Sequence, residues 1–274
     1  MAKRNCPHKI SRFVGFRPLS RGPLVEARGF TVVEIMIATG VFLILMYGIY
    51  NIFESSRTTY EAGEAKVDIQ QIARVAMERT ATDLRLAGYG FPTGAGAITA
   101  ATPTSISFWA DLNNASTILT TNVNAGGTDL TVDNASGIQV GDVLYLINGG
   151  QTEQLTVSAV NLGTNTVSVA TGATAGYPAG AQVTRPKLIT YALDGSAIEK
   201  DDGEGGGSQP LTDDIQAFQL QYFDDTDTEI LPGGLAANLG NIRRIRIAIT
   251  VQSQDGGVAT EVYTINSDVR VRNL

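Results

Sequence analysis

Glu34 is the residue whose position in this chain most clearly implies chemistry. It is the only charged residue in the apolar segment 30–53, FTVVEIMIATGVFLILMYGIYNIF. A carboxylate inside a membrane-spanning helix costs free energy, up to about 3 kcal/mol near the bilayer centre, and such groups are therefore almost always paired. The position of Glu34 consequently predicts a partner for its negative charge, which must come from outside this segment.

Segment 30–53 is long enough to cross a membrane as one helix. Its 24 residues, at about 1.5 Å each, would span about 36 Å, and the apolar core of a bilayer is about 30 Å thick. The preceding residues 1–29 carry seven basic side chains and one acidic side chain, Glu26. Because a basic flank stays on the cytoplasmic side, we expect a single-pass protein whose C-terminal part lies outside the cytoplasm.

The N-terminal region differs from a secretory signal peptide. Its apolar stretch is too long, and no A-x-A-like cleavage site follows it before Glu54. The favoured cleavage point lies upstream instead, between Gly29 and Phe30. Cleavage there would remove a basic leader peptide, residues 1–29, and would keep the apolar helix.

Residues 29–34, GFTVVE, resemble the cleavage signal of type IV prepilins. In that family a prepilin peptidase cuts after the glycine and methylates the new amino terminus. The resemblance implies cleavage between Gly29 and Phe30, N-methylation of Phe30, and an assembly salt bridge made by Glu34. An ordinary single-span anchor with a chance glutamate is the alternative.

Cleavage would give Phe30 a free amine one helical turn before Glu34, on the same helix face. In a stack of such helices, Glu34 of one subunit can pair with the amine of a neighbour, so that two costly charges neutralise each other. Assembly would then wait for processing, because the amine does not exist at this position before the cut.

Residues 54–88 predict a continuation of this helix. Between residues 55 and 86 there is no proline and only one glycine. Apolar side chains recur there at steps of three and four, which predicts an amphipathic stripe that packs in a core: Ile69, Ala73, Met77, Ala81 and Leu84. Gly88 suits a left-handed helix cap, and Pro92 prevents the helix from resuming.

The end of this helix carries a second resemblance. Residues 79–89, RTATDLRLAGY, are similar to the segment that closes the long helix of PilW-type minor pilins, and residues 267–274, SDVRVRNL, resemble that family's C-terminus. The large J-type pseudopilins of type II secretion systems share much of this layout. The resemblance implies a type IV pilin-like α+β fold, in which the long N-terminal helix packs on an antiparallel β-sheet.

After Pro92 the sequence alternates in short runs separated by turn residues, which predicts β-strands. We expect a pilin β head formed by residues 89–125 and 186–274, with a small β-barrel or sandwich inserted at 126–185. Residues 201–208, DDGEGGGS, are expected to form a flexible acidic loop. The strands expected in the insert are 128–132, 143–147, 153–160 and 166–169, and those in the head are 105–109, 188–193, 218–222, 245–251 and 263–271.

Composition excludes several functions. The chain has a net charge of −7, and the leader contributes +6 (seven basic residues against one acidic), which leaves −13 for residues 30–274. An acidic domain argues against broad nucleic-acid binding. Cys6 and His8 are the only cysteine and histidine and both lie in the leader, so the processed chain lacks catalytic triads, histidine metal sites and disulfides. We expect no enzyme and no cofactor, with one exception.

That exception is a calcium site. The sequence DDTDTE places four acidic side chains in one turn, and clustered oxygens of this kind bind calcium: Asp224, Asp225, Asp227 and Glu229. The glycine and the distal glutamate of an EF-hand are missing, so a plain acidic turn is the alternative. The basic group Arg243, Arg244 and Arg246 also has two interpretations, an anion-binding patch or a solvated strand face that pairs with the acidic loop or a neighbouring subunit.

Three function classes remain. The first is a minor type IV pilin, whose partners would be the prepilin peptidase, other pilins and minor pilins, and the inner-membrane assembly platform. The second is a type II secretion pseudopilin, and the third is a membrane-anchored adhesion module that binds through the inserted β domain. The first predicts a bacterial inner-membrane protein with a periplasmic head, which reaches the cell surface after assembly.

Overall fold

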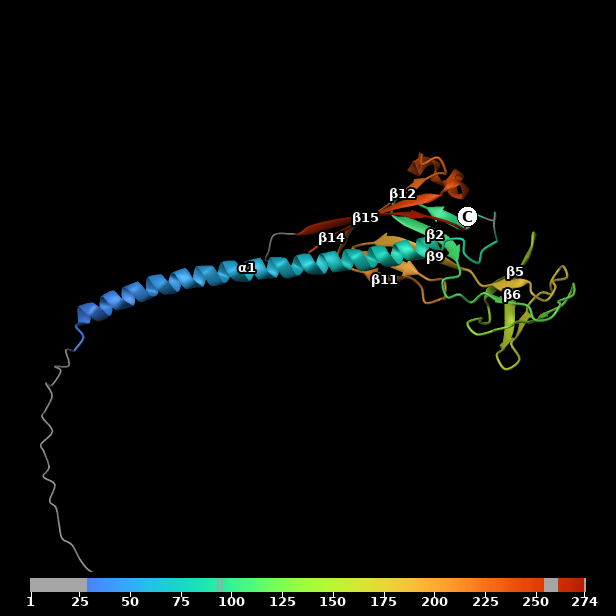
Figure 1. The fold of residues 1–274 in the computed structure, drawn as a ribbon, viewed down its shortest axis with the longest axis horizontal. Helices are drawn as coiled ribbons and strands as arrows, with labels where there is room; N and C mark the ends of the chain where they lie inside the picture. The colour runs from blue at the N-terminus through green and yellow to red at the C-terminus, as the bar shows by residue number, and fades with distance from the viewer. Residues whose placement is uncertain (1–28, 93, 95, 254–260, 274) are drawn as a thin grey trace, which may run out of the picture. The chain divides into compact units, whose positions relative to one another are not determined.

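The computed structural model describes residues 29–92, 94, 96–253 and 261–273. The leader up to residue 28, including Cys6 and His8, lies outside the described residues. The fold is α+β: one long helix, α1 (Val32–Arg85), precedes a series of antiparallel β-sheets (Figure 1). The chain divides into two units, residues 1–55 and 56–274.

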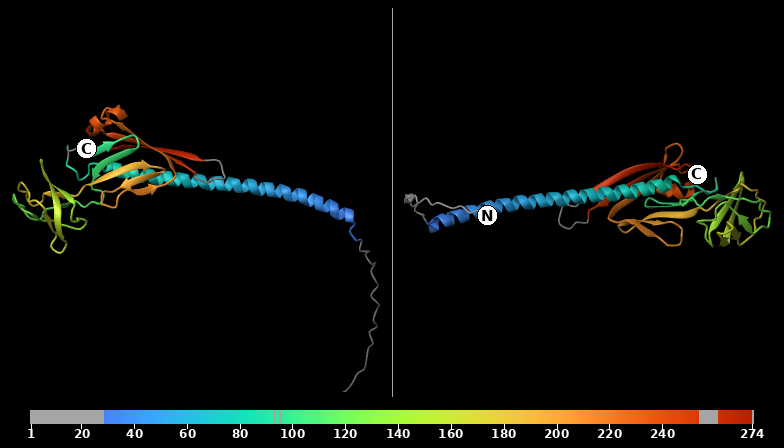
Figure 2. Two further views of the ribbon diagram at one scale, coloured as in Figure 1. Left: turned by 180° about the vertical axis from the view of Figure 1, so that it is seen from behind. Right: turned by 60° about the horizontal axis from the view of Figure 1, so that its bottom comes forward.

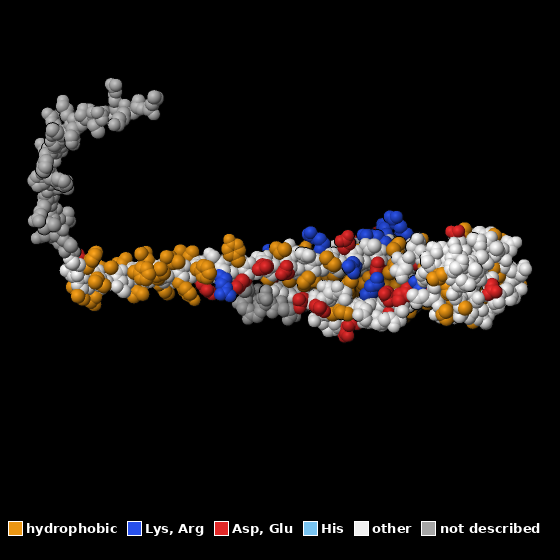
Figure 3. Space-filling view, turned by 90° about the horizontal axis from the view of Figure 1, so that it is seen from below, with side chains coloured by type: hydrophobic (Ala, Val, Ile, Leu, Met, Phe, Trp, Pro, Cys, Tyr) orange, Lys and Arg blue, Asp and Glu red, His pale blue; other side chains and the backbone are white. Residues whose placement is uncertain are grey.

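The first half of α1 is apolar on all sides. Every residue from 29 to 53 is exposed, and Figure 3 shows the side chains of this half as a nearly continuous apolar surface. In the described part of the chain, α1 is the one helix long and apolar enough to cross a membrane, with a mean hydropathy of 2.2 over its most apolar window. The expectation of a membrane-spanning helix is therefore met by length and composition.

The second half of α1 buries one stripe, as its spacing predicted. The five predicted positions, from Ile69 to Leu84, are all buried. Buried residues at three further positions complete the stripe: Ala65, Ala76 and Thr80. α1 ends at Arg85, close to the predicted end. Gly88, in the turn that follows, adopts φ +83°, and a side chain there would collide with the backbone of Asn273.

Two sheets share a core with this half of α1. Figures 1 and 2 show β9 and β11 on one side of the helix and β14 on the other. The five-stranded sheet has the order β1 (Ile98–Ala101), β2 (Ser105–Ala110), β9 (Lys187–Asp194), β10 (Ala197–Asp201), β11 (Gln209–Thr212). The four-stranded sheet has the order β13 (Glu229–Ile230), β12 (Ile215–Phe223), β14 (Arg244–Gln252), β15 (Val262–Arg270).

Alternation along the strands directs one face of each sheet into this core. In β14 all four predicted inward positions, from Ile245 to Val251, are fully buried, while the residues between them are half-buried. The pairing Leu220↔Ile247 sets the register of β12 against β14. Tyr222 of β12 is buried, and its hydroxyl donates to the carbonyl of Thr102 at 2.8 Å, which joins the two sheets.

A third sheet has a separate core. Its order is β3 (Thr117–Ile118), β8 (Gln182–Thr184), β5 (Val143–Asn148), β6 (Gln151–Asn161), β7 (Thr166–Val169), β4 (Asp129–Thr131). Leu130, Leu144 and Leu155 are among its buried residues, which form a cluster distinct from the core at α1. The four strands predicted here are confirmed, whereas β3 and β8 were not predicted, and β3 precedes the expected start of the insert at residue 126. The domain boundaries stay predictions.

The expected flexible loop at 201–208 is corrected by its contacts. The Asp201 carboxylate accepts a hydrogen bond from the Gly203 N–H at 2.9 Å, and Glu204 forms an ion pair with Arg185 at 2.7 Å. A Cβ at Gly203 would lie 2.8 Å from the carbonyl oxygen of Leu188. The loop is therefore anchored, because Asp201 binds a backbone N–H of the loop itself and Glu204 binds Arg185, which precedes β9.

Candidate functional site

The predicted processing site lies just before α1 and is fully accessible. Gly29 and Phe30 precede the helix, and the Phe30 side chain is 83% exposed. Thr31 follows as the helix cap, since its hydroxyl accepts a hydrogen bond from the Glu34 N–H at 3.2 Å. The Glu34 carboxylate accepts hydrogen bonds in return from the Thr31 N–H at 2.9 Å and from the Thr31 hydroxyl at 3.0 Å. This reciprocal arrangement is a capping box.

The capping box gives one carboxylate oxygen of Glu34 two hydrogen-bond donors within a single chain. Among the described residues no cation forms an ion pair with its carboxylate. Sequence-based reasoning assigned Glu34 to an intermolecular pair and missed Thr31, although the spacing T-x-x-E before an apolar run is a readable signal. Phe30, Glu34 and Ala38, at steps of four, line one open groove of about 580 Å³ along the helix.

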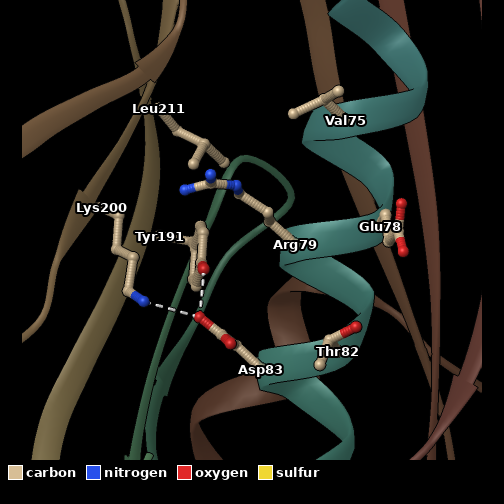
Figure 4. A pocket seen from close by; sticks show the side chains of 8 residues that line it. All are labelled: Val75, Glu78, Arg79, Thr82, Asp83, Tyr191, Lys200 and Leu211. Carbon is tan, nitrogen blue, oxygen red and sulfur yellow. Dashed lines mark hydrogen bonds and ion pairs between the residues drawn. The ribbon is translucent and has the colours of Figure 1, made fainter.

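The C-terminal end of α1 binds the five-stranded sheet through Asp83 (Figure 4). Its carboxylate accepts hydrogen bonds from the Tyr191 hydroxyl at 2.5 Å and from the Lys200 ammonium at 2.7 Å. Burial, together with the nearby Asp83 charge, raises the pKa of the Tyr191 phenol well above its ordinary value. Tyr191 therefore remains protonated and able to donate.

A pocket of about 430 Å³ opens beside this contact, between α1 and strands β9 to β11. Arg79 extends into it toward Leu211 (Figure 4). Arg79 and Asp83 are one helical turn apart, yet Asp83 is already occupied by Tyr191 and Lys200. Asp83 consequently attaches the end of α1 to the sheet.

The four acids of the predicted calcium site do not converge. Asp224 accepts hydrogen bonds from the Thr226 hydroxyl and from backbone N–H groups of its own turn, and these bonds lower its pKa. Asp227 instead forms an ion pair with Arg244 at 2.9 Å, and Glu229 accepts from Gln221. Asp225 is exposed. No group of three or more metal-binding side chains exists among the described residues. Calcium binding stays a prediction, and it would require Asp224, Asp227 and Glu229 to give up their present hydrogen bonds and ion pair in favour of the metal.

The basic group at the start of β14 (Arg243, Arg244 and Arg246) is held by local partners. Arg244 stacks over the Phe223 ring at 3.8 Å and pairs with Asp268 at 2.7 Å. Arg246 shares Asp268 at 3.2 Å, and Arg243 donates to the carbonyl of Gly240 at 2.7 Å. The expectation that these arginines pair with the acidic loop 201–208 is therefore wrong for Arg244 and Arg246, because nearer carboxylates occupy them.

An ion cluster that the sequence did not reveal connects the third sheet to the acidic loop. Arg185, 3% exposed, binds Asp142 at 3.0 Å and Glu204 at 2.7 Å, and Lys187 binds Asp142 at 2.7 Å. Burial alone would raise the pKa of Asp142, but hydrogen bonds from Lys187, the Gln139 N–H and Arg185 outweigh it and hold the pKa below its ordinary value. Buried charges of both signs thus hold the third sheet to the acidic loop 201–208.

Aromatic side chains reinforce this junction. The Phe91 ring stacks on Trp109 with centroids 5.6 Å apart and forms a T-shaped pair with Tyr145 of β5, with centroids 5.3 Å apart. Such pairs contribute about 0.5–1.5 kcal/mol beyond their buried area. The third sheet is therefore bound to the rest of residues 56–274 by both ionic and aromatic contacts.

Comparison with known proteins identifies no relative: no protein-family model, no curated protein and no solved structure matches this chain. The function must therefore be inferred from the residues and their arrangement.

Proposed function

We propose that the protein is a minor type IV pilin subunit. In this proposal prepilin peptidase cuts between Gly29 and Phe30 and methylates Phe30, and the processed chain joins a type IV pilus or primes its assembly. The observation that carries the proposal is the first half of α1, an apolar helix exposed on every side with a single acid, Glu34, in its first turn. Only lipid or other helices can cover such a surface stably in the cell.

The capping box explains how one chain tolerates Glu34 before assembly. Hydrogen bonds from Thr31 compensate part of the cost of placing the carboxylate near apolar surroundings. After cleavage, the amine of Phe30 in a neighbouring subunit would offer a full positive charge. Glu34 would then exchange its Thr31 bonds for an ion pair, and this exchange favours assembly of processed chains over unprocessed ones.

The remainder of the fold fits the same role. Half of α1 packed on antiparallel sheets supports a pilin-like head, and the separate core between β3 and β8 supports a small inserted β domain. The proposal places the helix in the bacterial inner membrane as a single span, with the head in the periplasm. After assembly the head would lie on the pilus at the cell surface, in contact with other pilins.

The direct test is mass spectrometry of the protein's N-terminus in membrane and sheared-filament fractions. The expected mature chain begins at N-methylated Phe30 in both fractions. A chain that keeps the basic leader in cells with active prepilin peptidase would overturn the proposal. A pseudopilin would show the same processing, so deletion of the gene must also be scored for piliation and for protein secretion.

The separate core of the third sheet favours a second candidate function, a membrane-anchored adhesion module. Removal of residues 126–185 is a blunt test, because it deletes both Asp142 and Arg185 from the junction and leaves Glu204 without its main partner. Surface substitutions on this sheet test adhesion more cleanly. Adhesion lost with intact pili would support the module, whereas lost pili would support a structural role.

A further inference from the structure

A polar groove lies where the turn after α1 meets the third sheet, and the proposed pilin function does not use it. It has a volume of about 590 Å³ and is lined by four separate segments of the chain. Its lining residues are Tyr89, Gly90, Asn114, Ser116, Thr117, Ile118, Asp133, Asn134, Gln182 and Thr184.

The groove combines hydrogen-bonding groups with one aromatic ring. The carboxylate of Asp133 and the amide of Gln182 are exposed and make no hydrogen bond with any described residue. Asn114 accepts a hydrogen bond from the Tyr89 hydroxyl at 3.3 Å through its oxygen, which leaves its amide N–H groups available. The Tyr89 side chain is 39% exposed and Ile118 is 45% exposed, so apolar surface lies beside these polar groups.

This chemistry selects one class of ligand. Among the described residues that line the groove there is no lysine, arginine or histidine, so nothing there would pair with a phosphate, sulfate or carboxylate. The lining is too polar for a lipid chain. A sugar has hydroxyls that both donate and accept hydrogen bonds, as amides and carboxylates require, and C–H faces that pack on an aromatic ring. We propose that this groove binds a neutral saccharide.

The lining is ordered by contacts within the chain. Asp111 accepts hydrogen bonds from the Ala115 N–H at 2.9 Å and the Ser116 hydroxyl at 2.6 Å, which shapes the loop before β3. Gly90 has φ +72°, and a Cβ there would lie 2.9 Å from Asp111. Among the lining residues, Thr184 is 4% exposed, and its hydroxyl has no hydrogen-bond partner among the described residues. A groove ordered in advance loses less entropy on binding.

This inference does not depend on the proposed pilin function. A groove in residues 56–274 can bind a sugar whether or not the chain enters a filament. The N-terminal processing test and the binding test below can therefore succeed or fail separately.

The experiment uses the full chain in detergent and an array of neutral oligosaccharides built from glucose, galactose, mannose and N-acetylglucosamine, beside their sialylated and sulfated forms. Saturable binding of at least one neutral oligosaccharide is expected, and its affinity is then measured by calorimetry. Gln182→Ala and Asp133→Ala should each weaken it about tenfold, since each removes a hydrogen-bonding group from the site.

The matched control is Gln139→Ala, an exposed glutamine on the same part of the chain that does not line the groove. It should leave the affinity unchanged. Tyr89→Phe keeps the ring and should retain most of the affinity, whereas Tyr89→Ala should lose it. Each variant is accepted only if its thermal midpoint matches the parent protein. Absence of neutral-sugar binding, preference for the anionic forms, or equal affinity of Gln182→Ala and Gln139→Ala would each overturn the proposal.

Discussion

Replacing Asp83 with alanine tests whether its contacts attach α1 to the five-stranded sheet. The Tyr191 side chain is fully buried, so its hydroxyl would lose its acceptor where water does not reach easily. An unsatisfied buried donor costs about 1–3 kcal/mol. The ion pair with Lys200 adds less than about 1 kcal/mol, because both side chains are partly exposed, 27% and 17%, and solvent screens them.

The sum predicts a loss of about 2 kcal/mol in the free energy of unfolding, which for a unit of this size lowers the thermal midpoint by about 4–8 °C. The assay is thermal unfolding of the full chain in detergent, followed by fluorescence of Trp109, the only tryptophan. Glu78→Ala is the matched control, since Glu78 is exposed on the same helix and forms no hydrogen bond or ion pair with any described residue. Its effect should stay within about 0.5 kcal/mol.

A double-mutant cycle decides whether the loss comes from the hydrogen bond itself. Tyr191→Phe removes the hydroxyl, so Asp83→Ala should cost about 1 kcal/mol less in that background than in the parent protein. Strictly additive losses would refute the assignment of Asp83 as the acceptor for Tyr191. So would a midpoint for Asp83→Ala that equals that of Glu78→Ala.

Three further predictions concern other parts of the chain. The Glu34→Ala protein should still be inserted and cut, but about tenfold less of it should reach sheared filaments, because the neighbour's amine is left unpaired. Thr31→Val removes only the cap hydroxyl, and this variant should assemble. Equal filament content in both variants would contradict the role of the Glu34 charge. The pKa of Asp142 is lowered in the folded protein, so its contribution to the free energy of unfolding is complete above the ordinary pKa of 3.8 and is lost as pH falls through the lower folded value. The thermal midpoint, measured over an acid titration, should fall in that range. Asp142→Asn should make the midpoint less dependent on pH there. Gly88→Ala should lower the free energy of unfolding by about 2 kcal/mol or more, because φ is +83° and the new Cβ would collide with the Asn273 carbonyl. An unchanged midpoint in calorimetric unfolding would exclude that strain.

Local patterns in the sequence determined most of the elements. The apolar residues from Ile69 to Leu84 recur every three or four positions, which is the period of an α-helix. Those from Ile245 to Val251 recur every second position, which is the period of a β-strand. The capping box of Thr31 and Glu34 is likewise set by neighbours within four residues. The short strands β3 and β8 were missed because two or three residues carry no measurable period.

The tertiary structure alone decided which distant side chains meet. Asp83 contacts Tyr191 across 108 positions of sequence, and Asp142 contacts Arg185 across 43. The acidic side chain of Glu204 was readable as part of a charged loop, but its partner depends on how β9 and β10 pair. Strand order and register determine which distant side chains become partners, and neither can be read from the residues adjacent in sequence to each charged side chain. The sequence therefore specified Glu34 and its helix, while the packed sheets specified the junction and the groove beside it.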